Sequence, residues 1–167
     1  MHQDNLLSNI FKNVKRKAAV QAKEKIAKVV SEKDAGLYDA INKGIEIASG
    51  EIIANLNSDD FYIDNNVIAD VVANMEDEKS DTLYSDLYYV DAIDTNKVTR
   101  NWVSGEYKSG MFFKGWMPPH PTFFVRKRVY DNYGKFNLEL KSASVNAIKS
   151  AIWVVKRSWT WGRFAYI

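Results

Sequence analysis

Apolar residues recur every three or four positions in three stretches of the chain, and this spacing predicts helices that bury one face. The stretches cover residues 6–28, 36–48 and 65–75. Shorter apolar, aromatic or β-branched runs predict strands at residues 27–30, 52–56, 82–90, 98–103 and 123–126. Strands and helices alternate through the first half of the chain, which predicts an α/β fold with a mostly parallel sheet flanked by helices.

The second and third predicted helices carry the clearest apolar stripes. The expected core-facing positions are Leu37, Ile41, Ile45 and Ala48 in one helix and Val67, Ile68, Val71 and Val72 in the other. Gly50 is the expected stop signal after the first of these helices. Further along, the turn-forming residues 94–96 separate two predicted strands, which indicates a β-hairpin.

Length and composition narrow the class of protein. A chain of 167 residues suits one domain, and 46% hydrophobic with 26% charged residues is ordinary globular composition. A formal net charge of +2 gives no reason to expect a nucleic-acid partner. The absence of cysteine excludes disulfides and suits a reducing cytoplasm. No apolar run approaches the roughly 18 residues that a membrane span needs.

Basic side chains gather near the start of the chain. They are Lys12, Lys15, Arg16, Lys17, Lys23, Lys25 and Lys28. The simpler interpretation is a solvated helix face. The alternative is peripheral contact with the anionic inner face of the membrane.

The segment 55–60, Asn-Leu-Asn-Ser-Asp-Asp, follows the apolar strand predicted at 52–56 and ends in two adjacent carboxylates. Ligands of α/β sheets bind outside the carboxyl ends of strands. Asp59 and Asp60 are therefore candidate ligands for a divalent cation, Mg²⁺ or Mn²⁺, which takes oxygen donors and is often shared with a phosphate. The alternative is that either aspartate caps the next helix.

Two longer stretches carry a family resemblance. Residues 31–45 read SEKDAGLYDAINKGI and lead through residues 48–51 into the aspartate pair, while residues 114–124 read KGWMPPHPTFF. Together these stretches closely resemble bacterial family 2 glycosyltransferases of the GT-A fold. The resemblance covers about residues 26–141, and the tail 142–167 is atypical. It implies a single, incomplete GT-A domain over residues 1–167.

The resemblance implies transfer of a sugar from a nucleotide-diphosphate donor, a UDP-sugar, to a hydroxyl of a glycan acceptor in polysaccharide or cell-envelope synthesis. Asp59, helped by Asp60, would hold the metal that neutralises the departing diphosphate. Asn57 stands where many relatives have the first acid of their Asp-x-Asp motif. Its amide could hydrogen-bond the donor ribose in place of that acid.

The resemblance also assigns residues to the donor side of the site. Glu32 and Asp34 match positions ahead of the second helix, and Asp39 and Asn42 lie in that helix. Acids at a helix start are also stabilising without any ligand, so a purely structural role stays open for these acids. Gly44 is expected to permit close packing of the helix on the sheet.

On the acceptor side the resemblance points to Trp116 and His120. His120 lies between Pro119 and Pro121, which restrict the backbone around it. Trp116 could stack on a sugar ring. The alternatives are an aromatic residue of the core and a structural histidine.

Two departures from the family pattern affect the expected activity. The family's first strand and its donor-binding Asp-Gly-Ser turn have no counterpart here, so part of the donor pocket is expected to be missing and a strand edge to be unpaired. In the tail, Val145 stands at the position of the expected catalytic base, and valine accepts no proton. A non-catalytic nucleotide-sugar and metal-binding pseudoenzyme and a gene fragment are therefore alternatives to an active enzyme.

Overall fold

The computed structural model describes residues 27–57, 59–138 and 158–166. The chain divides into two units, residues 1–33 and residues 34–167. Residues 27–33, the described part of the first unit, are exposed and contain no helix or strand. The strand predicted at 27–30 is therefore wrong, because a short apolar run forms a stable strand only where other elements pair or pack with it. The helix predicted over 6–28 lies outside the described residues, apart from residues 27 and 28, which are irregular.

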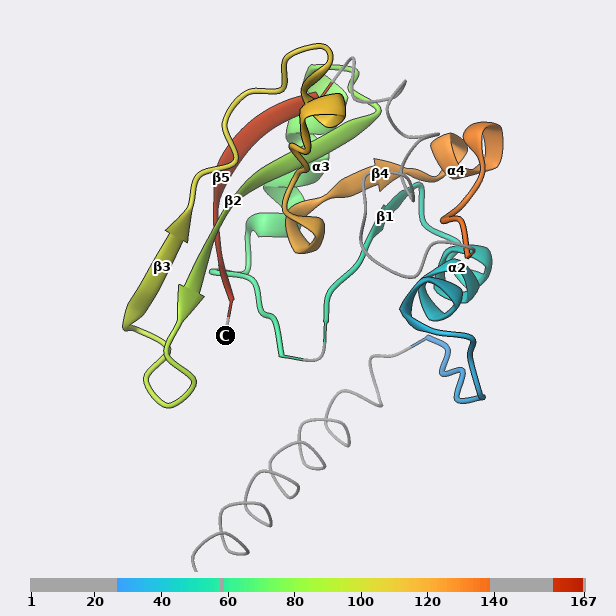
Figure 1. Ribbon diagram of the computed structural model, residues 1–167, viewed down its shortest axis with the longest axis horizontal. Coiled ribbons are helices and arrows are strands. Elements are labelled where there is room, and N and C mark those ends of the chain that lie inside the picture. The colour runs from blue at the N-terminus through green and yellow to red at the C-terminus, as the bar shows by residue number, and fades with distance from the viewer. Residues whose placement is uncertain (1–26, 58, 139–157, 167) are drawn as a thin grey trace, which may run out of the picture. The chain divides into compact units, whose positions relative to one another are not determined.

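The second unit contains the described helices and strands (Figure 1). In chain order they are α2 (Leu37–Ile47), β1 (Ile52–Ala54), α3 (Val67–Asp77), β2 (Thr82–Val90), β3 (Val98–Trp102), β4 (Phe124–Arg126), α4 (Lys127–Tyr133) and β5 (Ser158–Tyr166). Two short 3-10 turns, Met111–Lys114 and His120–Thr122, precede β4. The predicted α/β class is confirmed. Among the described residues, no helix has the length and apolarity that crossing a membrane requires.

The strands form one sheet in the order β1-β4-β2-β3, with β5 beside β2. β4 is antiparallel to both β1 and β2, β3 is antiparallel to β2, and β5 is parallel to β2. The prediction of a mostly parallel sheet is therefore wrong for the described strands. β1 and β2 do run in the same direction, as a strand-helix-strand order predicts, but β4 lies between them and takes their hydrogen bonds.

The predicted hairpin is confirmed by β2 and β3. Leu87 lies opposite Trp102, and the two strands pair in antiparallel register up to the turn. Asp91 closes this turn, because its Oδ1 accepts the backbone N–H groups of Ile93 and Asp94 at 2.9 and 3.1 Å. The short acidic side chain of Asp91 thus stabilises the turn between the two strands.

Each face of the sheet carries a buried cluster. On one face, α3 packs against β2 and β4 through Val67, Val71, Met75, Leu83, Leu87 and Phe124. The other cluster consists of Tyr84, Phe123, Val125 and Val129. Neighbouring residues of one strand, such as Leu83 and Tyr84, belong to different clusters because side chains alternate across a strand.

The predicted stripe of the third helix is only partly correct. Val67 and Val71 are buried, and Met75 extends their line by one more turn. Ile68 and Val72 are 48% and 41% exposed. The sheet is covered by one line of side chains at i, i+4 and i+8, which is narrower than the stripe that we predicted.

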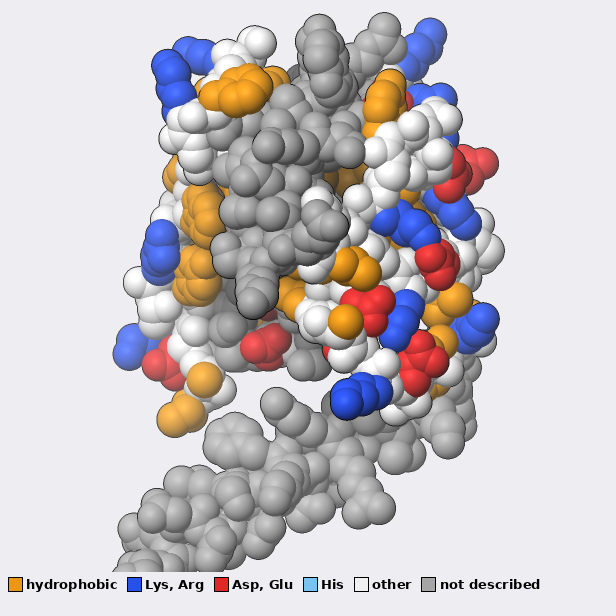
Figure 2. All heavy atoms as spheres, turned by 45° about the vertical axis from the view of Figure 1, so that its right-hand side comes forward, with side chains coloured by type: hydrophobic (Ala, Val, Ile, Leu, Met, Phe, Trp, Pro, Cys, Tyr) orange, Lys and Arg blue, Asp and Glu red, His pale blue; other side chains and the backbone are white. Residues whose placement is uncertain are grey.

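The exposed surface mixes both signs of charge. On the face that Figure 2 shows, Lys and Arg side chains lie among Asp and Glu side chains of the described residues. This intermixing agrees with the small net charge of +2. A binding site for a polyanion would instead concentrate basic side chains on one face.

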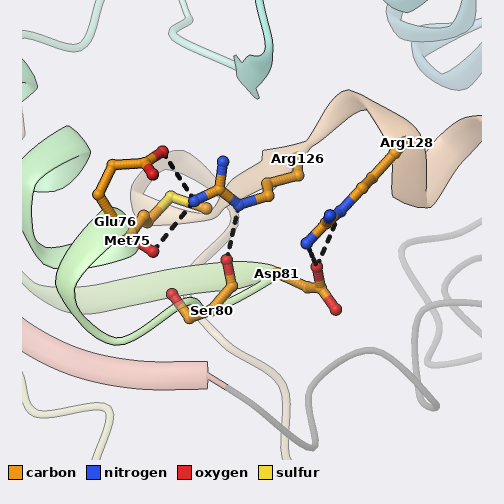
Figure 3. A network of polar contacts seen from close by, with 6 residues as sticks. All are labelled: Met75, Glu76, Ser80, Asp81, Arg126 and Arg128. Atoms are coloured by element: carbon orange, nitrogen blue, oxygen red, sulfur yellow. Dashed lines mark hydrogen bonds and ion pairs between the residues drawn. The ribbon is translucent and has the colours of Figure 1, made fainter.

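Arg126, at the end of β4, joins this strand to the end of α3 (Figure 3). Its Nε donates to the carbonyl oxygen of Ser80 at 2.9 Å, and its Nη2 donates to that of Met75 at 3.0 Å. Nη2 also forms an ion pair with Glu76 at 2.9 Å. The Met75 carbonyl, in the last turn of α3, also accepts the backbone N–H of Ser80 at 3.1 Å, so Arg126 adds a second bond to this end of the helix.

We predict that Arg126→Ala lowers the free energy of unfolding by roughly 3 kcal/mol, because the change removes charge-assisted hydrogen bonds to backbone carbonyls that stay largely buried. Arg128→Ala is the matched control. The exposed ion pair of Arg128 with Asp81 should contribute less than about 1 kcal/mol to the free energy of unfolding. Urea unfolding followed by circular dichroism measures both variants. Equal losses in the two would contradict the role assigned to Arg126.

Candidate functional site

The segment after β1 is held by a short chain of hydrogen bonds. Asn57 Nδ2 donates to Asp60 Oδ2 at 2.6 Å, and Asn55 Nδ2 donates to Asn57 Oδ1 at 3.3 Å. The backbone N–H of Asp60 also donates to the carbonyl oxygen of Asn57 at 3.2 Å. Asp60 is therefore held to Asn57 through both its backbone and its side chain.

The two aspartates differ in their surroundings. Asp59 is exposed, whereas Asp60 is partly buried. Burial raises the pKa of Asp60 above its ordinary value, the hydrogen bonds from Asn57 and its backbone act in the opposite direction, and the charge of Asp59 adds to the rise. Among the described residues, no Lys or Arg forms an ion pair with either carboxylate. A bound cation would relieve this local excess of negative charge.

The donor set suits a hard divalent cation that is shared with a phosphate ligand. Two adjacent carboxylates supply oxygen donors, and Mg²⁺ is commonly bound by one or two carboxylates with phosphate and water in the remaining positions. The described residues contain no group of three or more His, Cys, Asp or Glu side chains that could hold a metal alone. The helix-cap alternative is wrong for both aspartates, because α3 begins at Val67 with Asn66 at its N-cap.

The predicted donor-side acids are engaged in local contacts. Asp34 Oδ1 accepts the N–H of Gly36 at 3.1 Å, and Asp39 Oδ2 accepts the N–H of Ala35 at 2.9 Å. Asp39 also pairs with Lys43 at 3.1 Å. The bond from Ala35, followed by that from Lys43, lowers the pKa of Asp39. These contacts stabilise the start of α2, so the donor-binding role of Asp34 and Asp39 stays a prediction, as does that of the exposed Glu32.

Asn42 connects α2 to the segment that follows α4. Its Nδ2 donates to the carbonyl oxygen of Phe136 at 2.8 Å, and its Oδ1 accepts the N–H of Phe136 at 2.9 Å. The ring of Phe136 stacks on Tyr38, with 5.3 Å between centroids. Asn42 and Phe136 are 94 positions apart, so no local pattern in the sequence indicates this contact.

A groove of about 560 Å³ lies between α2 and β1. Ile41, Gly44 and Ile53 contribute to its mainly apolar lining. Outside the neighbouring residues and backbone of α2 itself, no described atom lies within 4 Å of the position that a Cβ would take at Gly44. The prediction of close packing at this glycine is therefore wrong for the described residues. β1 pairs with β4 on one side and with no described strand on the other, and the unpaired edge stays a prediction.

Trp116 lies at the border of an aromatic cluster. Its ring packs edge-on against Tyr84, with 5.4 Å between centroids, and at a tilt against Tyr107, with 5.5 Å between centroids. Its Nε1 donates to the carbonyl oxygen of Ser104 at 3.0 Å. Ser104 is fixed in turn, because its N–H and hydroxyl both donate to Asp86 Oδ1, at 2.9 and 2.8 Å. These contacts favour the structural interpretation of Trp116, and a sugar contact stays a prediction.

His120 lies on the groove between α2 and β1, which Asn55 and Asn57 also line. The structure thus brings a predicted acceptor-side residue and a predicted donor-side residue to one groove. His120 Nε2 is buried and has no hydrogen-bond partner among the described residues. Burial lowers the pKa of His120, which keeps the imidazole neutral near pH 7 and able to accept a hydrogen bond. Val145, at the expected position of the base, lies outside the described residues.

Known proteins resemble this chain in sequence and in fold. The family described as Glycosyl transferase family 2 matches residues 12–134. A PGL/p-HBAD biosynthesis glycosyltransferase of Mycobacterium bovis is 28% identical over 109 residues, which make up 65% of this chain and 40% of that protein. The same figures hold for a protein of Mycobacterium tuberculosis with the same description. The chain therefore spans about two fifths of the length of these relatives.

Among solved structures, S. aureus TarS 1-349 matches with a TM-score of 0.64 and 19% identity, over 90% of this chain and 46% of that chain. The same protein in complex with UDP-GlcNAc gives a TM-score of 0.61 and 20% identity, over 89% and 44%. At this level of identity the likeness shows the fold alone. It confirms the GT-A type of fold that the sequence motifs implied.

We predict that acidification destabilises the wild-type protein more than it destabilises the His120→Gln variant. An unfolded histidine has a pKa of about 6.5, so the stability that comes with a neutral His120 is present above this pH and is lost as the pH falls below it. Urea unfolding at about pH 7 and at about pH 5 measures the effect. His2→Gln, which removes the other histidine, is the control. Equal pH dependence in wild type and His120→Gln would show that burial of His120 has no influence on stability.

Proposed function

Because the chain belongs to glycosyl transferase family 2, we propose that it binds a nucleotide-diphosphate sugar together with a divalent cation at Asp59 and Asp60. The observation that carries this proposal is the carboxylate pair after β1, which forms no ion pair with a described Lys or Arg. Asn57 donates a hydrogen bond to Asp60 of this pair at 2.6 Å. Two TarS structures hold UDP-GlcNAc and UDP, which supports a UDP-sugar as the nucleotide ligand. The reaction of the site is transfer of the sugar to a hydroxyl of a glycan, in cell-envelope synthesis.

Residues that follow β1 support this proposal for binding of the diphosphate. Asp59 and Asp60 would hold the cation, and Asn57 fixes the orientation of Asp60. When bound, the cation supplies charge neutralisation to the departing diphosphate. His120 presents a neutral imidazole on the groove that Asn57 also lines, where it can accept a hydrogen bond from a sugar or acceptor hydroxyl.

Proton removal from the acceptor is the weak step of the proposed reaction. Val145 occupies the position that the family resemblance gives to the base, and its side chain has no lone pair. A general base typically contributes a factor of about a hundred to ten thousand in rate. We therefore propose that this chain retains nucleotide-sugar binding while its transfer activity is strongly reduced, as in a pseudoenzyme.

The proposed setting is the cytoplasm, and the proposed sugar donor there is a nucleotide-diphosphate sugar. The basic side chains in residues 12–28 would add peripheral contact with an anionic membrane surface. Co-sedimentation with vesicles of anionic and of neutral lipid tests this contact. Equal sedimentation with both would exclude a contact based on charge.

We predict that UDP binding requires Mn²⁺ or Mg²⁺ and weakens at least about tenfold in Asp59→Ala, because the carboxylate and the diphosphate share the cation. Isothermal titration of UDP with and without Mn²⁺ measures the affinity. Asp77→Ala, at the exposed end of α3, is the control and should bind as wild type does. Metal-independent binding of equal strength in wild type and Asp59→Ala would refute the assignment of the site.

We predict little or no sugar transfer by residues 1–167, because an acceptor hydroxyl without a base stays protonated at neutral pH. The measurement is release of UDP from a panel of UDP-sugars, with and without Mn²⁺, on protein whose folding circular dichroism has verified. Multiple turnovers that disappear in Asp59→Ala would contradict the prediction and require another residue as the base. His120→Ala would then be the first variant to test.

A further inference from the structure

Asn57 is the residue whose observed contacts differ most from its expected role. An amide that replaces the first acid of an Asp-x-Asp motif was expected to hydrogen-bond the ribose of the donor. In the structure, its Nδ2 is instead directed at Asp60 Oδ2, and its Oδ1 accepts from Asn55. The side chain of Asn57 is thus turned along its own segment toward the second aspartate.

We propose that Asn57 is a positioning residue that acts through Asp60: its amide fixes the Asp60 carboxylate in the orientation that receives the cation. The proposal rests on the proposed function for the cation and the diphosphate, and it adds a role for Asn57 that involves no contact with the nucleotide. Asn55 supports this arrangement by donating to Asn57 Oδ1 at 3.3 Å.

The geometry gives the reason for an amide at position 57. At a separation of 2.6 Å, Nδ2 donates a charge-assisted hydrogen bond to the Asp60 carboxylate. A carboxylate in the same place would set two negative charges against each other and supply no proton for the bond. The amide therefore restrains rotation of the Asp60 carboxylate and leaves its negative charge available for a cation.

The backbone supports the same orientation. The N–H of Asp60 donates to the carbonyl oxygen of Asn57, so this backbone bond and the side-chain bond both join positions 57 and 60. With backbone and side chain bonded to the same neighbour, Asp60 has little freedom left to reorient. Asp59 is exposed, and its side chain forms no hydrogen bond with another described residue.

A double-mutant cycle separates action through Asp60 from direct contact with the nucleotide. UDP is titrated calorimetrically at saturating Mn²⁺ into wild type, Asn57→Ala, Asp60→Asn and the double variant. We expect about fivefold weaker binding for Asn57→Ala alone and no further weakening when this change is added to Asp60→Asn. Asn101→Ala, on the exposed part of β3, is the matched control and should leave the affinity unchanged.

A fivefold loss that persists in the Asp60→Asn background would overturn the proposal, since it would mean that Asn57 contacts the nucleotide itself. Unchanged affinity in Asn57→Ala would overturn it as well. Circular dichroism of each variant establishes that the fold is retained, which is expected because Asn57 is exposed.

A second measurement needs neither metal nor nucleotide and separates this proposal from the proposed function. In the apo protein, the side-chain amide signals of Asn57 in a ¹H–¹⁵N spectrum should shift and exchange faster with solvent in Asp60→Ala. Unchanged signals would refute the hydrogen bond and with it the proposal, whatever the protein binds. Changed signals in a protein that fails to bind UDP with Mn²⁺ would instead refute the proposed function while the contact between Asn57 and Asp60 stands.

Discussion

The antiparallel pairing of β4 with β1 is the constraint on which the candidate site depends. In this register Ala54, the last residue of β1, lies opposite Phe124, the first residue of β4. The residues that follow β1 and those that precede β4 therefore meet at one edge of the sheet. This is how Asn57 and His120, far apart in sequence, come to line the same groove. A parallel β4 would carry His120 to the opposite end of β1.

The position of β4 depends in turn on contacts with both of its neighbours and with α3. Phe124 is buried between the sheet and α3, while Val125 faces the aromatic cluster on the other side. Arg126 then binds carbonyl groups at the end of α3. A strand of three residues is too short to be stable by its own hydrogen bonds, so these side-chain contacts hold the register that assembles the site.

Local patterns in the sequence were sufficient to predict most helices and strands, the hairpin and the place of the aspartate pair at the end of β1. They failed where the outcome depends on partners distant in the chain. The strand-helix-strand order correctly indicated that β1 and β2 run in one direction, but nothing local shows that β4 inserts between them. The contact of Asn42 with Phe136 was missed for the same reason. The contact of Asn57 with Asp60 is local, but the family motif records residue types and not the hydrogen bonds between them.

The residues proposed to bind the cation and the residue proposed to limit transfer lie in different parts of the sequence. Asp59, Asp60 and Asn57 follow a strand whose register the core holds, and their contacts come from their own segment. The expected base position, Val145, lies in the tail that departs from the family pattern. The hydrogen bonds described for Asp60 come from Asn57, a residue of the same segment. The residues proposed to bind the cation are therefore separate in sequence from the position proposed for the base.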